Sequence, residues 1–398
     1  MYRLARGNRL SSVDKYLDSI PLSISRTAMS IFMQAMETDT EKKFLNRNLQ
    51  NTNGFQRKNR DYEWQVVWRN VFAFIYLHIA AFYGIFLMVT GKAKLWTALF
   101  GLLFALLSAM GVTAGAHRLW AHRAYKAKWP LRLFLAIMQT MAFQNHIYEW
   151  VRDHRVHHKF TETDADPHNA KRGFFFSHIG WLMVRKHKDV FEKGASVDMS
   201  DLEKDPIVMF QKKTYLVVMP LLCFVLPAYI PVYFWGESAW NSWYIASILR
   251  YTISLHFTWL VNSAAHIWGN KPYDKNIGAT DNKMVAIFAV GEGWHNYHHV
   301  FPWDYKAAEL GNYSTNISTA LIDFAAKYGL AYDLKTVSAD MIRKRIARTG
   351  DGSHPWSKQA LETDEDHHHP ENPVWGWDDK DMTDDDKKFA QIVHQKEE

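Results

Sequence analysis

Apolar residues in this chain gather into long blocks separated by strongly charged stretches. Four blocks reach the roughly 20 residues that a helix needs to cross a bilayer. They occupy residues 71–90, 95–116, 214–235 and 240–262. Only residues 91–94 join the first pair and only residues 236–239 the last pair, so each pair is predicted to form a tight transmembrane hairpin. A shorter apolar run at 131–143 is more typical of a helix lying along the membrane surface.

Basic residues near the ends of these blocks predict how the helices are oriented. Four basic residues precede the first block, namely Arg57, Lys58, Arg60 and Arg69. Two more, Lys212 and Lys213, end the long middle segment. Lys92 and Lys94 in the first turn oppose this bias, but the middle segment holds many more basic residues. We therefore expect both turns to face the lumen. Both termini and the middle segment should face the cytosol.

This pattern predicts an all-α integral membrane protein with four transmembrane helices in two hairpins and a cytosolic helical cap. Residues 1–67 form a cytosolic amino-terminal segment, residues 68–334 the membrane-embedded domain, and residues 335–398 a cytosolic carboxyl-terminal extension. Residues 1–54 lack an apolar core of about 7–15 residues, so no cleavable signal is expected. Beyond Thr349 the chain becomes acidic, notably at 378–386, and we expect this extension to be partly mobile.

Composition excludes several classes of function. The net charge of +6 could suggest nucleic-acid binding, but no run of five basic residues occurs and the basic residues lie between apolar blocks. We therefore expect no nucleic-acid partner. The chain has a single cysteine, Cys223, which excludes a disulfide framework and disfavours cysteine-based metal or redox chemistry. Histidine, with 20 residues, is the chemical resource that remains.

Nine histidines form four clusters that can meet beside the membrane. They are His117, His122, His154, His157, His158, His266, His295, His298 and His299. In the second and fourth clusters the spacing i, i+3, i+4 places three imidazoles on one face of a helix. The first and third clusters follow the cytosolic ends of apolar blocks, and the other two lie in segments predicted to be cytosolic. All nine imidazoles can therefore converge on one site.

Nine imidazoles are too many for one metal ion. A catalytic zinc site needs three protein ligands and a structural one four. No His-Glu-x-x-His pair is present to indicate a zinc protease. Two ions with four or five nitrogen ligands each match the count, with Asn262 available through its amide or a water. Imidazole suits iron, zinc, copper and nickel, so the ligand type leaves the metal open.

The other histidines have plainer interpretations. A lone histidine is more often a surface or satisfied core residue than a ligand, and we apply this to His78, His146, His168, His178 and His187. Arg250 and His256 lie within the fourth apolar block, where interhelical hydrogen bonding is the preferred interpretation. His367–His369 form a weak metal-binding tract in the acidic extension, where the same plain interpretation is preferred.

Whole phrases around the clusters resemble the stearoyl-CoA desaturase family, the membrane acyl-CoA Δ9 desaturases. The resemblance covers residues 68–334, and details such as Trp268 and Trp294 are similar to its insect branch. The phrases are Thr113-Ala-Gly-Ala-His-Arg-Leu-Trp-Ala-His122, Asp153-His-Arg-Val-His-His-Lys-Phe160, Asp166-Pro-His-Asn169, Arg172-Gly-Phe-Phe-Phe-Ser-His178 and Gly291-Glu-Gly-Trp-His-Asn-Tyr-His-His299. The resemblance implies two iron ions held by the nine clustered histidines, with Asn262 nearby.

The resemblance also implies a substrate site for long-chain saturated acyl-CoA. Residues that would hold the coenzyme A moiety are Asn70, Asn145, Arg152, Asp153, Arg185, Lys186 and Trp259. Trp150, Thr258 and Trp181 would line a bent acyl tunnel, and Ala105 and Ala109 would lie beside the methyl end of the chain. Phosphates need cations and an acyl chain needs an apolar channel, which suits these residue types. Membrane anchoring is the alternative role for Arg185 and Lys186.

In this family, reduced iron and O₂ remove two hydrogens from the acyl chain and leave water and a cis double bond. A redox metal is needed because no side-chain base can deprotonate an unactivated methylene. The tunnel would set the position of the bond by fixing the distance from the coenzyme handle. A hydroxylase with similar histidines is one alternative, and a metal transporter or metal-dependent receptor is another. The bond position and the preference for C16 or C18 chains stay open.

Electrons must come from another protein. The chain has neither a Cys-x-x-Cys-His haem site nor a Gly-x-Gly-x-x-Gly dinucleotide fingerprint. The resemblance therefore implies a separate membrane cytochrome b5, reduced by NADH-cytochrome b5 reductase. We expect it to dock on the basic cytosolic face, with Lys159, Lys171 and Arg172 as candidate contacts, and a solvated surface without a partner is the alternative role for these three residues.

Overall fold

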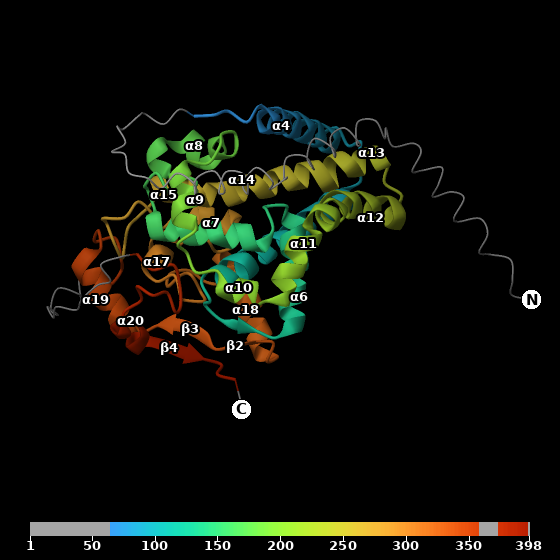
Figure 1. Ribbon diagram of the computed structural model, residues 1–398. Helices are drawn as coiled ribbons and strands as arrows, with labels where there is room; N and C mark the ends of the chain where they lie inside the picture. Colours follow the sequence, from blue (N-terminus) through green and yellow to red (C-terminus); the bar gives the residue numbers. More distant parts are fainter. Residues whose placement is uncertain (1–63, 358–372, 397–398) are drawn as a thin grey trace, which may run out of the picture. The chain divides into compact units, whose positions relative to one another are not determined.

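The computed structural model describes residues 64–357 and 373–396, which are mostly helical (Figure 1). Two short antiparallel sheets of two strands each complete the described structure. The chain divides into two compact units. One consists of Met1–Gly101 with Phe224–Leu249, and the other of Leu102–Cys223 with Arg250–Glu398.

The first unit is built from apolar helices that pack closely. Its elements are α4 (Trp68–Val89), the start of α5 (Leu95–Met110), α12 (Leu226–Trp235), α13 (Ala239–Ser242) and the π-helical η5 (Trp243–Leu249). α4 lies against η5, and a Cβ at Gly84 would stand 2.7 Å from the carbonyl oxygen of Tyr244. A side chain at this position would therefore separate the two helices.

The two turns predicted at residues 91–94 and 236–239 lie together in this unit. The backbone N–H of Lys94 donates to Glu237 (2.8 Å), and its ammonium donates to the carbonyl oxygens of Trp235 (2.6 Å) and Gly236 (2.8 Å). Lys94 thus satisfies carbonyls that the end of α12 leaves unpaired. This contact accounts for a lysine in the turn that opposed the predicted orientation.

Three helices in the described part of the chain are long and apolar enough to cross a membrane. They are Trp68–Val89, Leu95–Ala121 and Pro206–Trp235. The predicted fourth block is helical through α13, η5 and α14 (Arg250–Asn262) but is not among them. Arg250 and His256 lie in it and lower its apolar character. The mostly helical class with apolar helices is confirmed, and the four-span arrangement stays a prediction.

The second unit holds most of the remaining elements. Its helices up to residue 223 are η1 (Gly111–Ala121), α6 (Trp129–Ala142), α7 (Ile147–Phe160), η2 (Ala170–Arg172), α8 (Phe174–His178), η3 (Gly180–Leu182), α9 (Lys188–Gly194), α10 (Ser200–Glu203) and α11 (Pro206–Pro220), followed by η4 (Leu221–Val225) at the boundary. After α14 come α15 (Ala264–Ile267), α16 (Lys283–Phe288), α17 (His295–Val300), η6 (Tyr313–Thr315), α18 (Ile317–Lys327), α19 (Ala339–Thr349) and α20 (Asp384–Phe389). The strands are β1 (Lys126–Ala127), β2 (Ala331–Tyr332), β3 (Leu334–Val337) and β4 (Ala390–Val393).

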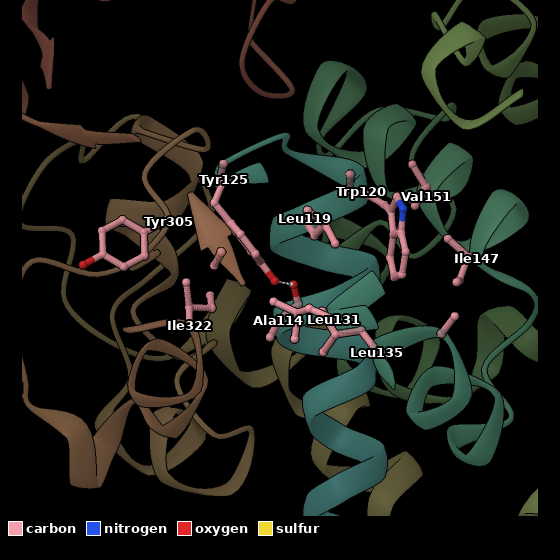
Figure 2. Close-up of a cluster of buried hydrophobic side chains, with 14 of the residues drawn as sticks. Ala114, Leu119, Trp120, Tyr125, Leu131, Leu135, Ile147, Val151, Tyr305 and Ile322 are labelled. Atoms are coloured by element: carbon pink, nitrogen blue, oxygen red, sulfur yellow. Dashed lines mark hydrogen bonds between the residues drawn. The ribbon is translucent and has the colours of Figure 1, made fainter. Parts of the chain in front are cut away.

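A buried apolar cluster surrounds η1 and holds it against its neighbours. Figure 2 shows Leu119 and Trp120 of η1 with Leu135 of α6 and Ile147 of α7, all buried. The hydroxyl of Tyr125 donates to the carbonyl oxygen of Ala114 (2.8 Å), which closes the segment after η1 back onto the helix. This packing positions the ends of η1 and α7, which carry five of the clustered histidines.

η1 is wound as a π-helix, which the apolar pattern did not predict. In an α-helix, residues five apart point about 140° away from each other. The π winding pairs residue i with i+5, and the N–H of His122 bonds to the carbonyl oxygen of His117 (3.1 Å). The two imidazoles therefore lie together, with ring centroids 4.7 Å apart.

The carboxyl-terminal extension is packed in its described part. β4 pairs antiparallel with β3, and Figure 1 shows the two strands side by side. Val374 and Met382 are buried in an apolar cluster with Tyr297 of α17 and Ile342 of α19. The acidic composition predicted mobility at 378–386, but interspersed apolar side chains give this segment a packing face. His367–His369 lie outside the described residues.

Candidate metal centre

The nine clustered histidines come together in two groups, each with ligand nitrogens within 4.8 Å of one another. The five-histidine group consists of His117, His122, His154, His158 and His298. The four-histidine group consists of His157, His266, His295 and His299. All members belong to the second unit.

Two helices each supply both groups. α7 gives His154 and His158, four residues apart, to the five-histidine group and His157 to the other. α17 does the reverse, giving His298 to the five-histidine group and its i, i+4 pair His295 and His299 to the four-histidine group. The predicted helical spacing is confirmed, and it lets one helix contribute to both groups, because i+3 and i+4 lie on either side of residue i.

The Nε2 atoms of these rings face one another. In the five-histidine group, Nε2 of His298 lies 2.9 Å from that of His117 and 3.1 Å from that of His158. In the four-histidine group, Nε2 of His295 lies 3.0 Å from that of His266 and 3.1 Å from that of His299. Two nitrogen ligands at right angles on one ion, each about 2.1 Å from it, would be about 3 Å apart.

Acceptors on the far side of three rings determine which nitrogen carries the proton. Nδ1 of His117 lies 2.9 Å from the carboxylate of Glu292, and Nδ1 of His157 lies 2.9 Å from that of Asp166. Nδ1 of His122 faces the carbonyl oxygen of Trp375. Because these oxygens can only accept, the neutral rings of His157 and His122 have their proton on Nδ1 and a lone pair on Nε2, and the Glu292 carboxylate favours the same form of His117. Lone pairs on Nε2 therefore point into both groups, which is the orientation that a metal ligand needs.

Glu292 is itself held by a buried arginine. Arg118, 1% exposed, donates through Nε (3.0 Å) and Nη2 (2.9 Å) to one oxygen of Glu292, leaving the other for His117. It also donates to Thr319 (2.9 Å). Arg118 lowers the pKa of Glu292 against the opposing effect of burial, so the carboxylate is ionised. Our sequence reasoning gave no role to Glu292, although it lies in the phrase that begins at Gly291.

Asp166 does the same for the four-histidine group. Its carboxylate faces His157 and accepts backbone N–H groups from His168 (3.1 Å) and Glu162 (3.0 Å). These contacts, with His157 foremost, keep the pKa of Asp166 low although burial opposes this. His168, which we interpreted as an unremarkable histidine, lies against His157 with ring centroids 4.4 Å apart and the ring planes tilted by 46°. The signal was again present, because both residues lie in the phrase Asp166-Pro-His-Asn169.

Burial keeps most of these imidazoles neutral. Desolvation and then the neighbouring imidazoles lower the pKa of His154, His158, His298 and His299 well below the usual value. Neutral imidazole is the form that binds a metal. Among the described residues, Nδ1 of His266, His295 and His298 has no hydrogen-bond partner, and Nδ1 of His117 faces Glu292 at 2.9 Å as an ion pair and not as an aligned hydrogen bond. The donor set therefore fits metal ions of the kind that imidazole prefers.

The coenzyme A residues predicted on α7 and near residue 186 meet in one charged cluster. Lys186 pairs with Asp153 (2.6 Å) and Glu149 (3.3 Å), and Arg152 pairs with Asp153 (3.1 Å). Burial lowers the pKa of Lys186, but Asp153 and Glu149 more than offset it, so the lysine stays charged. Arg185 is exposed beside this cluster. Asn145 lies at the start of α7 with a left-handed backbone (φ 68°).

The predicted tunnel residues lie at several places in the second unit. Trp150 stacks on His154 (4.8 Å between centroids), so it borders the five-histidine group. The ring centroids of Trp181 and His168 lie 5.5 Å apart, and those of buried Trp259 and His178 lie 5.7 Å apart. Thr258 accepts a hydrogen bond from Gln144 (2.9 Å). Ala105 and Ala109 lie one turn apart on α5, both half-buried, whereas Asn70 belongs to the first unit.

Two further predicted residues have different surroundings from those expected. Asn262 is the last residue of α14, half-buried, and its role near the metal stays a prediction. Lys159 was a candidate contact for an electron donor on an open basic face. Its side chain is instead 9% exposed and paired with Asp379 (2.7 Å) and Asp381. Charge counting along the sequence missed this, because the partners are more than 200 residues away.

Fold and site define a mostly helical protein with apolar helices of membrane-spanning length and a histidine-rich cluster compatible with a metal site. The fatty acid desaturase family model matches residues 93–332. The chain is 60% identical over 341 residues to an acyl-CoA Delta-9 desaturase of Acheta domesticus, covering 86% of this chain and 90% of that protein. It is 59% identical to an acyl-CoA Delta12-desaturase of Acheta domesticus (81% and 85% covered) and 59% identical to stearoyl-CoA desaturase 5 of Homo sapiens (72% and 86% covered). The chain therefore belongs to the fatty acid desaturase family and is an oxidoreductase of acyl-CoA desaturase type.

Proposed function

We propose that this chain is a diiron, O₂-dependent desaturase that places a cis Δ9 double bond in long-chain saturated acyl-CoA. The observation that carries the proposal is the convergence of nine imidazole nitrogens in groups of five and four. The nine histidines are the proposed ligands, with Asn262 available to one ion through its amide or a water. One ion in each group gives the ligand numbers that the sequence pattern predicts.

Iron is proposed over zinc because the reaction is a redox reaction. An unactivated methylene is too weak an acid for any side-chain base, and two bound iron ions with O₂ would supply the oxidising power. The chain's own residues prepare the site. Glu292, Asp166 and the carbonyl of Trp375 orient three rings, and the ring of Trp150 covers His154. Such partners raise the basicity of the ligands and fix their direction.

Substrate recognition is proposed to combine a charged handle with an apolar channel. The coenzyme A contacts would be Asn70, Asn145, Arg152, Asp153, Arg185, Lys186 and Trp259, and the acyl chain would run along Trp150, Trp181, Thr258, Ala105 and Ala109. In support of this, Arg152, Asp153 and Lys186 form one cluster, and α7, which carries Arg152 and Asp153, also carries three of the histidines. Holding the handle would set which carbon pair reaches the metal.

Electron supply and location complete the proposal. The donor would be a membrane cytochrome b5, reduced by NADH-cytochrome b5 reductase. The enzyme would lie in the endoplasmic reticulum membrane with four spans and both termini in the cytosol. Three apolar helices of spanning length support a membrane location. The hydrogen bonds between the two turns support their lying on one side of the bilayer.

Expression in a desaturase-deficient yeast tests the proposal. Gas chromatography and mass spectrometry of the cellular fatty acids should show new cis Δ9 C16 or C18 acids that need O₂. A new double bond at position 12 would overturn the proposed Δ9 position and agree with the position in the name of the Delta12-desaturase of Acheta domesticus. Hydroxylated acids would overturn desaturation in favour of hydroxylation, and an unchanged profile at normal abundance would overturn the proposed enzyme.

A further inference from the structure

Residues 373–396, which we call the C-terminal strap, cross over His122 and touch both its ring and its main chain. The carbonyl oxygen of Trp375 accepts from Nδ1 of His122, and the N–H of Trp377 donates to the carbonyl oxygen of His122 (2.9 Å). Between these two contacts lies Gly376, where a Cβ would stand 2.5 Å from the same carbonyl oxygen. The strap therefore lies directly on the backbone of this histidine.

Buried ion pairs and ring contacts hold the strap at this place. The guanidinium groups of Arg155 and Arg123 lie 4.1 Å and 4.8 Å from the Trp375 ring centre. Asp379 accepts from the N–H of Trp375 (2.9 Å) and pairs with the ammonium of Lys159 (2.7 Å), the neighbour of His158. These contacts link the strap to α7, the helix that carries three of the histidines.

Arg155 also connects the strap to the residues before His122. It is fully buried and donates to the carbonyl oxygens of Ala121 (3.0 Å) and Trp120 (2.7 Å). The end of η1 is thus held by Arg155 on one side and by the strap on the other. His122 is the residue that ends this helix, and its backbone N–H still bonds to the carbonyl oxygen of His117 (3.1 Å), so the strap contacts add to that helical bond.

We propose that the strap is a positioning element of the metal centre and that it acts through His122. The carbonyl oxygen of Trp375 accepts from Nδ1 of His122 and so holds the ring with its Nε2 atom in the five-histidine group, 2.9 Å from Nε2 of His154. This inference rests on the proposed metal site. It adds a requirement that the histidine clusters do not reveal. The orientation of His122 depends on Trp375, which lies 253 residues further along the chain.

Gly376→Ala tests the proposal, because its methyl group must push the strap away from His122. The matched control is Gly194→Ala, whose Cβ would meet Val156 and Arg152 at 3.6 Å and 3.7 Å, ordinary contact distances. The readout is chelator-resistant iron per purified full-length chain, with folding followed by gel filtration in detergent. We expect about two irons in the parent and control and about one in Gly376→Ala, because ligand-orienting contacts change metal affinity by about 10- to 100-fold.

A double-mutant cycle separates positioning from general packing. If the strap acts through His122, Gly376→Ala should lower the retained iron no further once His122→Ala is present. Additive losses would overturn the proposal and make the strap a structural element only. Iron in Gly376→Ala equal to that in Gly194→Ala would overturn it as well.

A second pair of variants decides the matter if Gly376→Ala does not fold. Asp379→Asn weakens the anchor of Trp375, and Asp378→Asn makes the same change on an exposed neighbour. Selective iron loss in Asp379→Asn supports the proposal, and equal iron in both overturns it. A parent protein without iron would count against the proposed diiron function itself, whereas iron in the parent that is insensitive to the strap counts against this inference alone.

Discussion

The two histidine groups use the same ligand but are assembled differently. The four-histidine group takes its members from α7, α15 and α17, and one ring, His157, is held by Asp166 from the loop after its own helix. The five-histidine group adds the π-helical end of η1. Its rings are held by Glu292, which follows His117 by 175 residues, and by the carbonyl of Trp375.

This difference shows that ligand spacing and ligand orientation come from separate parts of the sequence. Helical i, i+3 and i+4 spacing places His295, His298 and His299 on one side of α17, from which they reach the two groups. Orientation requires acceptors on the far nitrogens, and the five-histidine group takes these from remote segments. We therefore expect the larger group to depend more on long-range contacts, although it has one more ligand.

Removing one ligand from each group should have the largest effect. His298→Ala takes a ring from the five-histidine group and His157→Ala one from the four-histidine group. Each should reduce turnover to less than about a tenth and lower iron by about one ion per chain. Losing a group that only orients a ligand already changes metal affinity by about 10- to 100-fold, and losing the ligand itself should cost more. Turnover is measured as Δ9 product per quantified protein in membranes.

The control for these variants is His394→Asn, on an exposed histidine whose φ of 51° asparagine tolerates well. It should keep parental turnover and iron. If either ligand variant kept more than a tenth of the turnover, the proposal that each histidine group holds one catalytic metal ion would be wrong.

Changing the orienting carboxylates should have a smaller effect that differs between the groups. Asp166→Asn should weaken iron binding in the four-histidine group by about 10- to 100-fold, and Glu292→Gln should do so in the five-histidine group. Glu292→Gln should also lower thermal stability, because it leaves buried Arg118 without its carboxylate. Chelator competition measures both affinities. Asp164→Asn, on an exposed carboxylate that belongs to neither histidine group, is the control and should bind iron like the parent.

The sequence allowed the ligand set and its helices to be predicted, because imidazole spacing is a local property. His154, His157 and His158 lie on one helix as expected, and so do His295, His298 and His299. The division into five and four was predicted only as a count. Which histidine joins which group depends on how α7 and α17 face each other, and no pattern within one helix carries that information.

Other features were missed because they depend on distant pairing or on a change in helix winding. The π turn at His117 and His122 replaces a pattern that looks α-helical, since apolar residues favour both. The acidic extension looked mobile because few aliphatic residues mark it, yet Val374, Trp375 and Met382 are buried. Acidic Asp379 and Asp381 find their partner in Lys159, which composition had assigned to the surface.

The charged cluster beside α7 provides a test outside both histidine groups. Arg185→Gln with Lys186→Gln should raise KM for stearoyl-CoA about tenfold or more, because a charge-assisted hydrogen bond contributes roughly 1.5–3 kcal/mol and each decade costs about 1.4 kcal/mol. The effect should shrink at high salt, which screens exposed Arg185. Iron content should not change. An unaltered KM with reduced protein in membranes would mean that the two residues only anchor the chain.

The smallest expected effect concerns chain length and leaves both histidine groups intact. Ala105 and Ala109 are half-buried on α5, and the family resemblance places the methyl end of the acyl chain beside them. Ala109→Leu adds three carbon atoms at this position and should shorten the channel, so product should shift from C18 towards C16 or shorter while iron per chain stays parental. Ala98→Leu, nearer the start of the same helix, is the matched control and should keep the parental C18 to C16 ratio. Gas chromatography of cells fed equal C16 and C18 acids measures the ratio. If Ala109→Leu and Ala98→Leu gave the same ratio, this face of α5 would not line the acyl channel. The residues that limit chain length would then lie on another helix.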